Sequence, residues 1–204
     1  PVDVPLSMLF GDLPITEMEV KEEFVEALNE DNSEDIDLGD SITKVLQHPT
    51  VSSKSFLITI GDRTVSGMVA RDQFVGPYQV PVSDYSLSLR SYTSNNGEVL
   101  SIGEKPTIAL IKPAASMRMA LGEALTNMSG VVIKGLNNVQ VSANWMAASG
   151  ENSDDFALRS GVEALSKIAV DLKVSIPVGK DSLSMRTKWS ENNSDYEVSS
   201  PVSY

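Results

Sequence analysis

The chain has 204 residues, with 16 Lys and Arg against 28 Asp and Glu, one His and no Cys. Without Cys the sequence excludes thiolate catalysis, Cys-ligated zinc and iron–sulfur clusters, and a single His excludes a His-rich metal site. The net charge of −12 argues against nucleic acid or an anionic membrane as the main partner. No apolar run approaches the ~20 residues that a membrane-spanning helix needs.

The N-terminal part of the sequence indicates a linker with short helices. Prolines disfavour a regular element over residues 1–15, and a capping box of Thr16 and Glu19 predicts a helix directly after them. Asp40 is expected to cap a second short helix, which ends before Pro49 because the residue preceding a proline is pushed out of the helical region. The chain begins with Pro rather than Met, so we expect a piece of a longer polypeptide.

From residue 46 to residue 204, strand and helix signals are mixed. The β-branched runs that end at turn residues predict strands at 55–61, at 64–70, within 75–92, and at 107–111, 131–135, 139–145 and 173–179. Helix formers predict a helix at 114–128 and a third long helix that Ser153 caps. We expect turns at 93–98 and 179–182 and a polar tail after residue 188. Because the elements do not alternate strictly, the pattern predicts an α+β fold, a mixed or antiparallel sheet with helices on one face.

Glu123 and Asn127 are the first candidate metal ligands. They lie four residues apart on a predicted helix, so both side chains project from one face. A carboxylate and an amide oxygen suit a hard cation such as Mg²⁺, which binds few protein oxygens alongside phosphate oxygens. The alternative, which spacing alone favours, is an exposed polar helix face without a ligand.

Two further segments carry groups suited to a phosphate or a metal ion. Asp84 lies at the expected start of a strand, where it either completes an oxygen ligand set or forms a turn. Gly179, Lys180 and Ser182 combine a close backbone approach, a positive charge and a hydroxyl, although a simple surface turn is the alternative.

Other polar residues have weaker signals. Lys54 precedes the first expected strand and either meets a nucleotide phosphate or faces solvent. Arg71 and Asp72 lie within apolar sequence, which predicts an internal structural network or a substrate contact. His48 is expected only to end a helix, and Trp145 to lie in the core.

Five segments, taken in order, resemble one family. They are GDRTVSGMVARDQFVGPYQVPV, IGEKP, GEALTN, LNNVQVSANWMAA and IPVGKDSLSM. The chain is similar to the phosphoribosylformylglycinamidine synthases of the large, single-chain kind over most of residues 45–190. The resemblance implies the fold of the N-terminal domain of aminoimidazole ribonucleotide synthetase, whose sheet pairs with a like subdomain. It also implies a linker at 1–45 and the second ATP-binding, sheet-forming subdomain at 46–204.

The function that the resemblance implies is that of a cytoplasmic, ATP-dependent ligase. Such enzymes convert formylglycinamide ribonucleotide and glutamine to the amidine in de novo purine biosynthesis, with Mg²⁺ and ATP or ADP bound. The expected partners are the remaining parts of the same polypeptide, namely the first synthetase half and the glutaminase domain. The family's catalytic His and Cys belong to those parts, so we expect no catalytic residue here and a piece inactive by itself.

The resemblance also implies roles for individual residues. The implied magnesium ligands are Asp84, Glu123 and Asn127, and a further acid of the family's set is missing. The implied nucleotide or substrate contacts are Lys54, Ser83, Gly179 and Ser182. Lys180 stands where small relatives have Asn, which removes the basis for a metal role there.

Two alternatives remain open from the sequence. One is a stand-alone member of the wider ATP-dependent superfamily, similar to aminoimidazole ribonucleotide synthetase or a related kinase. The other is a non-enzymatic interaction module that keeps the fold without nucleotide. For the isolated piece we expect a homodimer formed through the sheet, because the partner subdomain's surface is uncovered.

Overall fold

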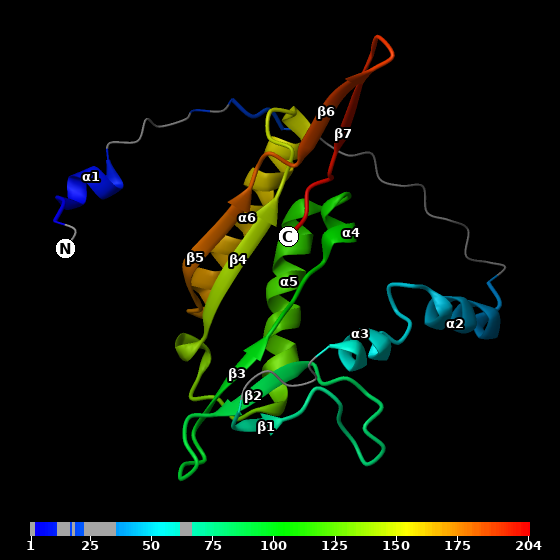
Figure 1. Ribbon diagram of the computed structural model, residues 1–204, viewed down its shortest axis with the longest axis vertical. Helices are drawn as coiled ribbons and strands as arrows, with labels where there is room; N and C mark the ends of the chain where they lie inside the picture. Colours follow the sequence, from blue (N-terminus) through cyan, green and yellow to red (C-terminus); the bar gives the residue numbers. More distant parts are fainter. Residues whose placement is uncertain (1–2, 12–16, 18, 23–35, 62–66) are drawn as a thin grey trace.

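The computed structural model describes residues 3–11, 17, 19–22, 36–61 and 67–204 (Figure 1). The α-helices are α1 (Leu6–Phe10), α2 (Leu38–Gln47), α3 (Ser55–Ile60), α4 (Pro106–Ala109), α5 (Pro113–Asn127) and α6 (Asn152–Leu172). The strands are β1 (Val69–Arg71), β2 (Tyr85–Leu89), β3 (Gly97–Ser101), β4 (Gln140–Met146), β5 (Ser175–Ser182), β6 (Arg186–Glu191) and β7 (Ser194–Ser199). Two 3-10 turns, η2 (Met128–Gly130) and η3 (Leu136–Asn138), connect α5 to β4.

The strands form three small sheets. β1, β2 and β3 make an antiparallel sheet in that order, with Tyr85 opposite Ser101 and Leu89 opposite Gly97. β4 and β5 pair in parallel, and β6 and β7 form an antiparallel hairpin. The parallel pair is connected through α6, as a parallel connection requires a crossover.

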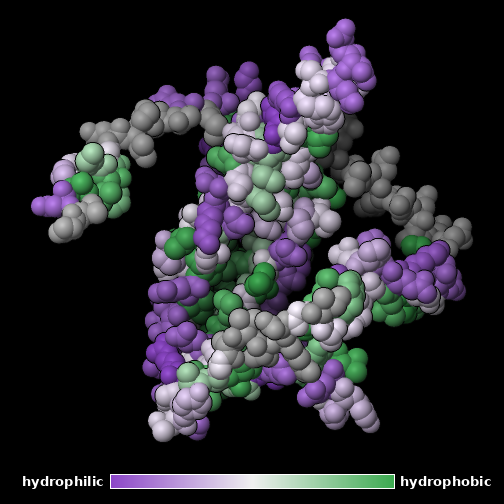
Figure 2. Space-filling view, viewed as in Figure 1, coloured by the Kyte–Doolittle hydropathy of each residue, from purple (hydrophilic) through white to green (hydrophobic). Residues whose placement is uncertain are grey.

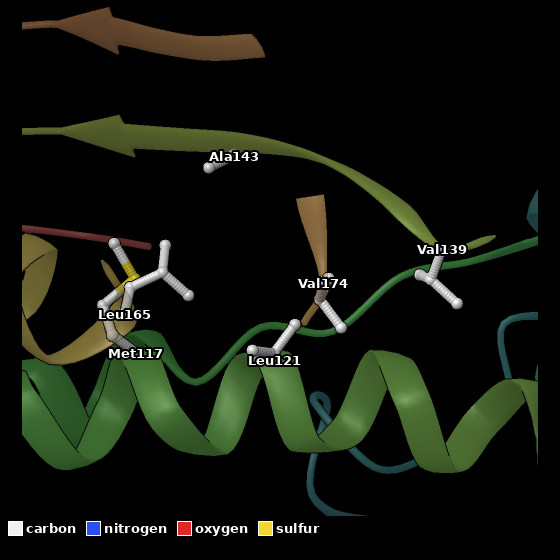
Figure 3. Close-up of a cluster of buried hydrophobic side chains, with 6 residues drawn as sticks. All are labelled: Met117, Leu121, Val139, Ala143, Leu165 and Val174. Carbon is white, nitrogen blue, oxygen red and sulfur yellow. The ribbon is translucent and has the colours of Figure 1, made fainter. Parts of the chain in front are cut away.

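The two long helices cover one face of the strands. α5 and α6 pack against each other, and in Figure 1 they lie behind β3, β4 and β5. The core between helices and strands is a cluster of buried apolar side chains (Figure 3). Its members are Met117, Leu121, Val139, Ala143, Leu165 and Val174. The expectation of an α+β fold with helices on one face is therefore confirmed.

Local sequence explains where these helices begin and end. Pro113 opens α5, where its missing N–H group is not needed and its fixed φ suits a helix. Lys173 takes a left-handed conformation after α6 and donates its N–H to Val170. The expected helix at 114–128 and the expected strands within 75–92, at 139–145 and at 173–179 are confirmed, apart from their exact bounds.

Three of the expected strands are wrong. Residues 55–60 form helix α3, in which the Thr59 hydroxyl donates to the carbonyl of Ser55 one turn earlier. Periodicity does not distinguish a strand from a helix in a short apolar run. Here the β-branched residues suggested a strand, which is wrong. Residues 106–109 form helix α4, whose start at Pro106 is a helix signal that the apolar run concealed. Residues 131–135 belong to no regular element.

The N-terminal expectations are confirmed in part. A short helix, α1, begins directly after Pro5 and ends before Gly11, so the expectation of no regular element over residues 1–15 is wrong for residues 6–10. Asp37, and not Asp40, caps α2, because its carboxylate accepts the N–H of Asp40 at 2.6 Å. α2 ends at Gln47, before Pro49, as expected.

Two segments of the N-terminal half lie partly outside the described residues. The helix expected after Thr16 is one of them, and its described residues 17 and 19–22 are not helical. The strand expected at 64–70 is the other. β1 accounts for its last residues, whereas residues 62–66 lie outside the described part.

Three expectations in the C-terminal half are corrected. α6 begins at Asn152, so Ser153 lies within the helix and does not cap it. Residues 179–182 continue strand β5 and form no turn. The polar tail contains the β6–β7 hairpin, whose connection uses Asn192 and Asn193 at positive φ, a turn that asparagine tolerates well.

Candidate functional site

Glu123 projects from the middle of α5 toward the segment 102–105 that connects β3 to α4. Its Oε2 accepts the backbone N–H of Glu104 at 2.8 Å, and its Oε1 lies 2.6 Å from the Lys105 ammonium. Both side chains of this ion pair are about one-third exposed, at 32% and 30%. Glu123 therefore holds the connecting segment with both carboxylate oxygens.

Asn127 reaches the same segment. One helical turn after Glu123, it donates its side-chain amide to the carbonyl of Ile102 at 2.9 Å. Asp84 directly precedes β2, whose Tyr85 lies opposite Ser101, and its side chain makes no hydrogen bond or ion pair with this segment among the described residues. Glu123 and Asn127 thus converge on residues 102–105, whereas a metal role for Asp84 beside them stays a prediction.

The segment 102–105 is tightly fixed against α5. Ser116 is fully buried and donates its hydroxyl to the carbonyl of Lys105 at 2.6 Å. Gly103 lies so close to α5 that a Cβ atom there would overlap the carbonyl of Ala120 and lie 2.6 Å from the N of Ala124. Only glycine permits this approach, so Gly103 brings the segment within reach of Glu123.

The surroundings of Glu123 favour its ionised form. The Lys105 ammonium, through its hydrogen bond, is the main cause that lowers the pKa of Glu123 below its ordinary value of 4.5. The backbone N–H of Glu104 lowers this pKa further, and partial burial opposes both. The carboxylate is therefore charged at neutral pH and available to a cation.

Ser83 has a structural role beside Asp84. Its hydroxyl accepts the Nε–H of Arg71 at 2.9 Å and donates to the carbonyl of Tyr85 at 2.7 Å. The Arg71 guanidinium also lies over the Tyr85 ring, 4.8 Å from its centre. This network fixes the backbone on both sides of Asp84, and it gives Arg71 the internal contacts that the sequence left open.

Lys54 does not reach this cluster through any contact seen in the described residues. Its ammonium donates to the carbonyls of Thr50 and Ser52, at 3.0 and 2.9 Å, and so closes the turn before α3. A nucleotide contact by Lys54 stays a prediction.

Gly179 and Ser182 lie on β5, away from the cluster of Glu123. A Cβ atom at Gly179 would lie 3.1 Å from the Trp145 ring on the neighbouring strand, which accounts for glycine at this position. The carbonyl of Ser182 accepts the N–H of Ala147. Their expected contacts in the active site also stay predictions.

The oxygen atoms near residues 102–105 fit a magnesium ion in kind. Glu123 supplies a carboxylate and Asn127 an amide oxygen, and Mg²⁺ binds such groups together with phosphate oxygens and water. Within the described ranges, no three carboxylate or His side chains gather at one place. Asp84, Glu123 and Asn127 would therefore hold the ion only as a partial set, and Lys105 now occupies one carboxylate oxygen of Glu123.

Lys105 is the residue of this cluster that sequence reasoning missed. It lies within the segment IGEKP, 18 positions before Glu123, so no helical or strand spacing connects the two residues. Only the turn of the chain from β3 into α5 brings them together. The fully buried Ser116, which holds the Lys105 carbonyl, was equally hidden within a run of helix formers.

The fold and this cluster define an α+β domain of the PurM N-terminal-like kind. A family model described as the FGAR-AT PurM_N-like domain matches residues 53–204. This match covers most of the chain, and the chain therefore belongs to that family. The family is part of the ATP-dependent synthetases of purine biosynthesis, which confirms the resemblance at the family level. None of the helices described in the structure is long and apolar enough to cross a membrane.

Proposed function

We propose that this chain is the nucleotide-binding, second sheet-forming part of a large, single-chain phosphoribosylformylglycinamidine synthase. The observation that carries the proposal is that Glu123 and Asn127 meet at the segment 102–105, and Asp84 is proposed to complete their ligand set. The family match supports an ATP-dependent synthetase, and in this proposal these side chains hold its Mg-nucleotide.

In this proposal the protein groups position the nucleotide, and the bound ion supplies charge neutralisation at its phosphate oxygens. Glu123 and Asp84 provide negative charge, and Asn127 provides a neutral oxygen. We propose that the ammonium of Lys105, which now pairs with Glu123, meets a phosphate oxygen once the ion is bound. The formation of the amidine and the release of ammonia from glutamine belong to other parts of the polypeptide, so the chain by itself is inactive.

The proposed partners are the first synthetase half and the glutaminase domain of the same cytoplasmic polypeptide. The face of β4 that is turned away from α5 and α6 supports a partner, since Ser142 and Asn144 on it are exposed. Leu100 on β3, also 67% exposed, adds an apolar contact. We expect a like subdomain to cover this face, and a second copy of the chain to replace it in the isolated protein.

One observation favours a different function. Glu123 already uses both carboxylate oxygens inside the protein, and Asn127 already holds Ile102. In an interaction module that keeps the fold without a nucleotide, these contacts within the protein would be the whole role of Glu123 and Asn127. The two functions differ in whether Asp84, which does not hold residues 102–105 in this way, matters for ligand binding.

Titration calorimetry with Mg-ADP tests the proposal. The unchanged chain is expected to release binding heat that Asp84→Ala lowers strongly. Asp171→Ala removes the same charge from an exposed position near the end of α6 and serves as the control, with heat equal to that of the unchanged chain. Equal heats for the unchanged chain and Asp84→Ala would favour the interaction module.

A further inference from the structure

Two open sheet edges flank a groove in the middle of the molecule. As strands, β3 pairs only with β2 and β4 pairs only with β5 in the part of the chain that the structure describes. Between their other edges lies a groove of about 360 Å³. Residues 99–103 and 139–144 line this groove, and in Figure 1 the arrows of β3 and β4 point in the same general direction. Figure 2 shows hydrophobic atoms within the hollow at this place.

The floor of the groove is apolar and belongs to the core. Met117 and Leu121 of α5, Leu165 of α6 and Ala143 of β4 line it, and all four are members of the buried cluster. Water above such a floor gains few hydrogen bonds, so an apolar side chain placed here is stabilised by burial.

The walls of the groove are rows of backbone hydrogen-bonding groups. Ser175 of β5 donates to the carbonyl of Val139, so the odd-numbered residues of β4 turn their N–H and C=O groups to β5. Because successive residues of a strand alternate in direction, the N–H and C=O groups of Ser142 and Asn144 point into the groove. On the other side of the groove, the N–H of Arg90 donates to the carbonyl of Asn96. By the same alternation, the even-numbered residues of β3 turn their N–H and C=O groups to β2. An edge of this kind is a template for another strand.

The backbone of Val99 and Ser101 therefore faces the groove from the opposite side. The two rows belong to strands with the same general direction. One added strand, antiparallel to both, satisfies both rows at once.

The C-terminal tail already forms the first backbone pair of that strand. Ser203 and Met146 exchange two backbone hydrogen bonds of 2.9 Å, so the tail runs antiparallel to β4 along its open edge. Tyr204 lines the groove and donates its hydroxyl to the carbonyl of Ala157 on α6 at 2.5 Å. Gly161 leaves room for this ring, because a Cβ atom there would lie 2.8 Å from it.

We propose that polypeptide continuing from Tyr204 fills the groove as an antiparallel strand between β3 and β4 and joins the two sheets into one. The inference rests on the proposed function, in which the chain is one part of a larger polypeptide. Tyr204 points inward, so the second and fourth residues after it point to the apolar floor and have to be apolar. The residues between them face outward, as Ser142 and Asn144 do.

Two extended chains test this strand. One adds five residues after Tyr204 with Val at the second and fourth positions and Thr elsewhere, and its matched control has Asp in place of the two Val residues. The readout is amide hydrogen exchange, followed by NMR, at Val99, Ser101, Ser142 and Asn144. The Val extension is expected to slow exchange at these amides by about tenfold or more, and the Asp extension is expected to leave it unchanged.

Each other outcome overturns the inference. Unchanged exchange with the Val extension would show that the groove accepts no strand. Equal protection by both extensions would show that the apolar floor does not select the occupant. Protection that grows with protein concentration would assign the strand to a second copy. Mg-ADP binding is measured separately on the same proteins, so a failure of the proposed function remains distinguishable.

Discussion

Glu123 is held by two donors that lie next to each other in the chain, and this decides what a metal ion has to displace. The Lys105 ammonium is a cation already in place at 2.6 Å, whereas the N–H of Glu104 leaves the carboxylate's charge available. A magnesium ion therefore competes with Lys105 for one oxygen.

The first residue-scale prediction concerns pH. A carboxylate whose folded-state pKa is lowered contributes stability that is complete above its ordinary value of 4.5 and is lost as the pH falls through the folded-state pKa. Glu123→Gln removes this contribution. The difference in unfolding free energy between the unchanged chain and the variant, no more than about 1 kcal/mol for a partly exposed pair, is expected to shrink in acid. Denaturant unfolding at several pH values measures it, and a difference that stays constant below 4.5 would contradict the account.

The second residue-scale prediction concerns Lys105. Lys105→Gln removes the competing cation and leaves the charge on Glu123, so the affinity for Mn²⁺ alone, used in place of Mg²⁺, is expected to rise about two- to fivefold. Titration of Mn²⁺ followed by electron paramagnetic resonance measures this affinity. Lys44→Gln, which breaks an exposed ion pair with Asp40 on α2, is the control and is expected to change nothing. Weaker metal binding by Lys105→Gln would contradict the competition.

At the scale of elements, the sequence predicted strongly patterned elements and failed on runs without a pattern. The helix at 114–128 and the strand at 139–145 have many helix formers or an alternating pattern, and both are confirmed. The runs at 55–61 and 107–111 are apolar without alternation, so their residues fitted a strand as well as a helix. α4 packs against α5, a contact that its short apolar run does not indicate, whereas Phe56 and Leu57 of α3 are exposed.

The candidate site shows the same limit. Glu123 and Asn127 could be paired from their helical spacing, whereas a position at an expected strand start left Asp84 either a metal ligand or a turn former. What brings Glu123, Asn127 and Lys105 together is the path of residues 102–105, which Gly103 and Ser116 fix. Neither residue carries a pattern in the sequence that would indicate this.

Gly103 provides a prediction for this segment. Gly103→Ala places a methyl group against the backbone of α5 and is expected to lower the free energy of unfolding by about 1–3 kcal/mol, as overpacking does. Gly122→Ala is the control, since a Cβ atom there meets nothing within 4 Å, and it is expected to be neutral or slightly stabilising. Thermal or denaturant unfolding measures both. Equal stability of the two variants would show that the close approach of Gly103 is unimportant.

The C-terminal tail gives the second element-scale prediction. Tyr204→Phe removes the hydroxyl that donates to Ala157, which is expected to cost about 1 kcal/mol of stability. Tyr78→Phe removes a hydroxyl from a side chain that is 88% exposed, and no change is expected. Denaturant unfolding compares them. A Tyr204→Phe variant as stable as the unchanged chain would show that the tail is not anchored on α6.

At the scale of the whole molecule, the uncovered surfaces are the face of the strands opposite the helices and the groove between β3 and β4. α5 and α6 cover one face of β3, β4 and β5, and the described residues leave the other face and the groove between β3 and β4 open. We predict that the isolated chain forms a homodimer through this open face, because a second copy replaces the like subdomain. Light scattering at high protein concentration measures the mass, and a monomer would refute the prediction.

The central claim is that residues 84, 102–105, 123 and 127 form the nucleotide-bound metal site. Mn²⁺ with ADP, added to the isotope-labelled chain, tests it most directly, because the paramagnetic ion broadens the NMR signals of nearby amides. We predict broadening that is strongest at Asp84, Glu104, Glu123 and Asn127 and absent at Asp171. Broadening centred elsewhere, or none at these four residues, would contradict the claim.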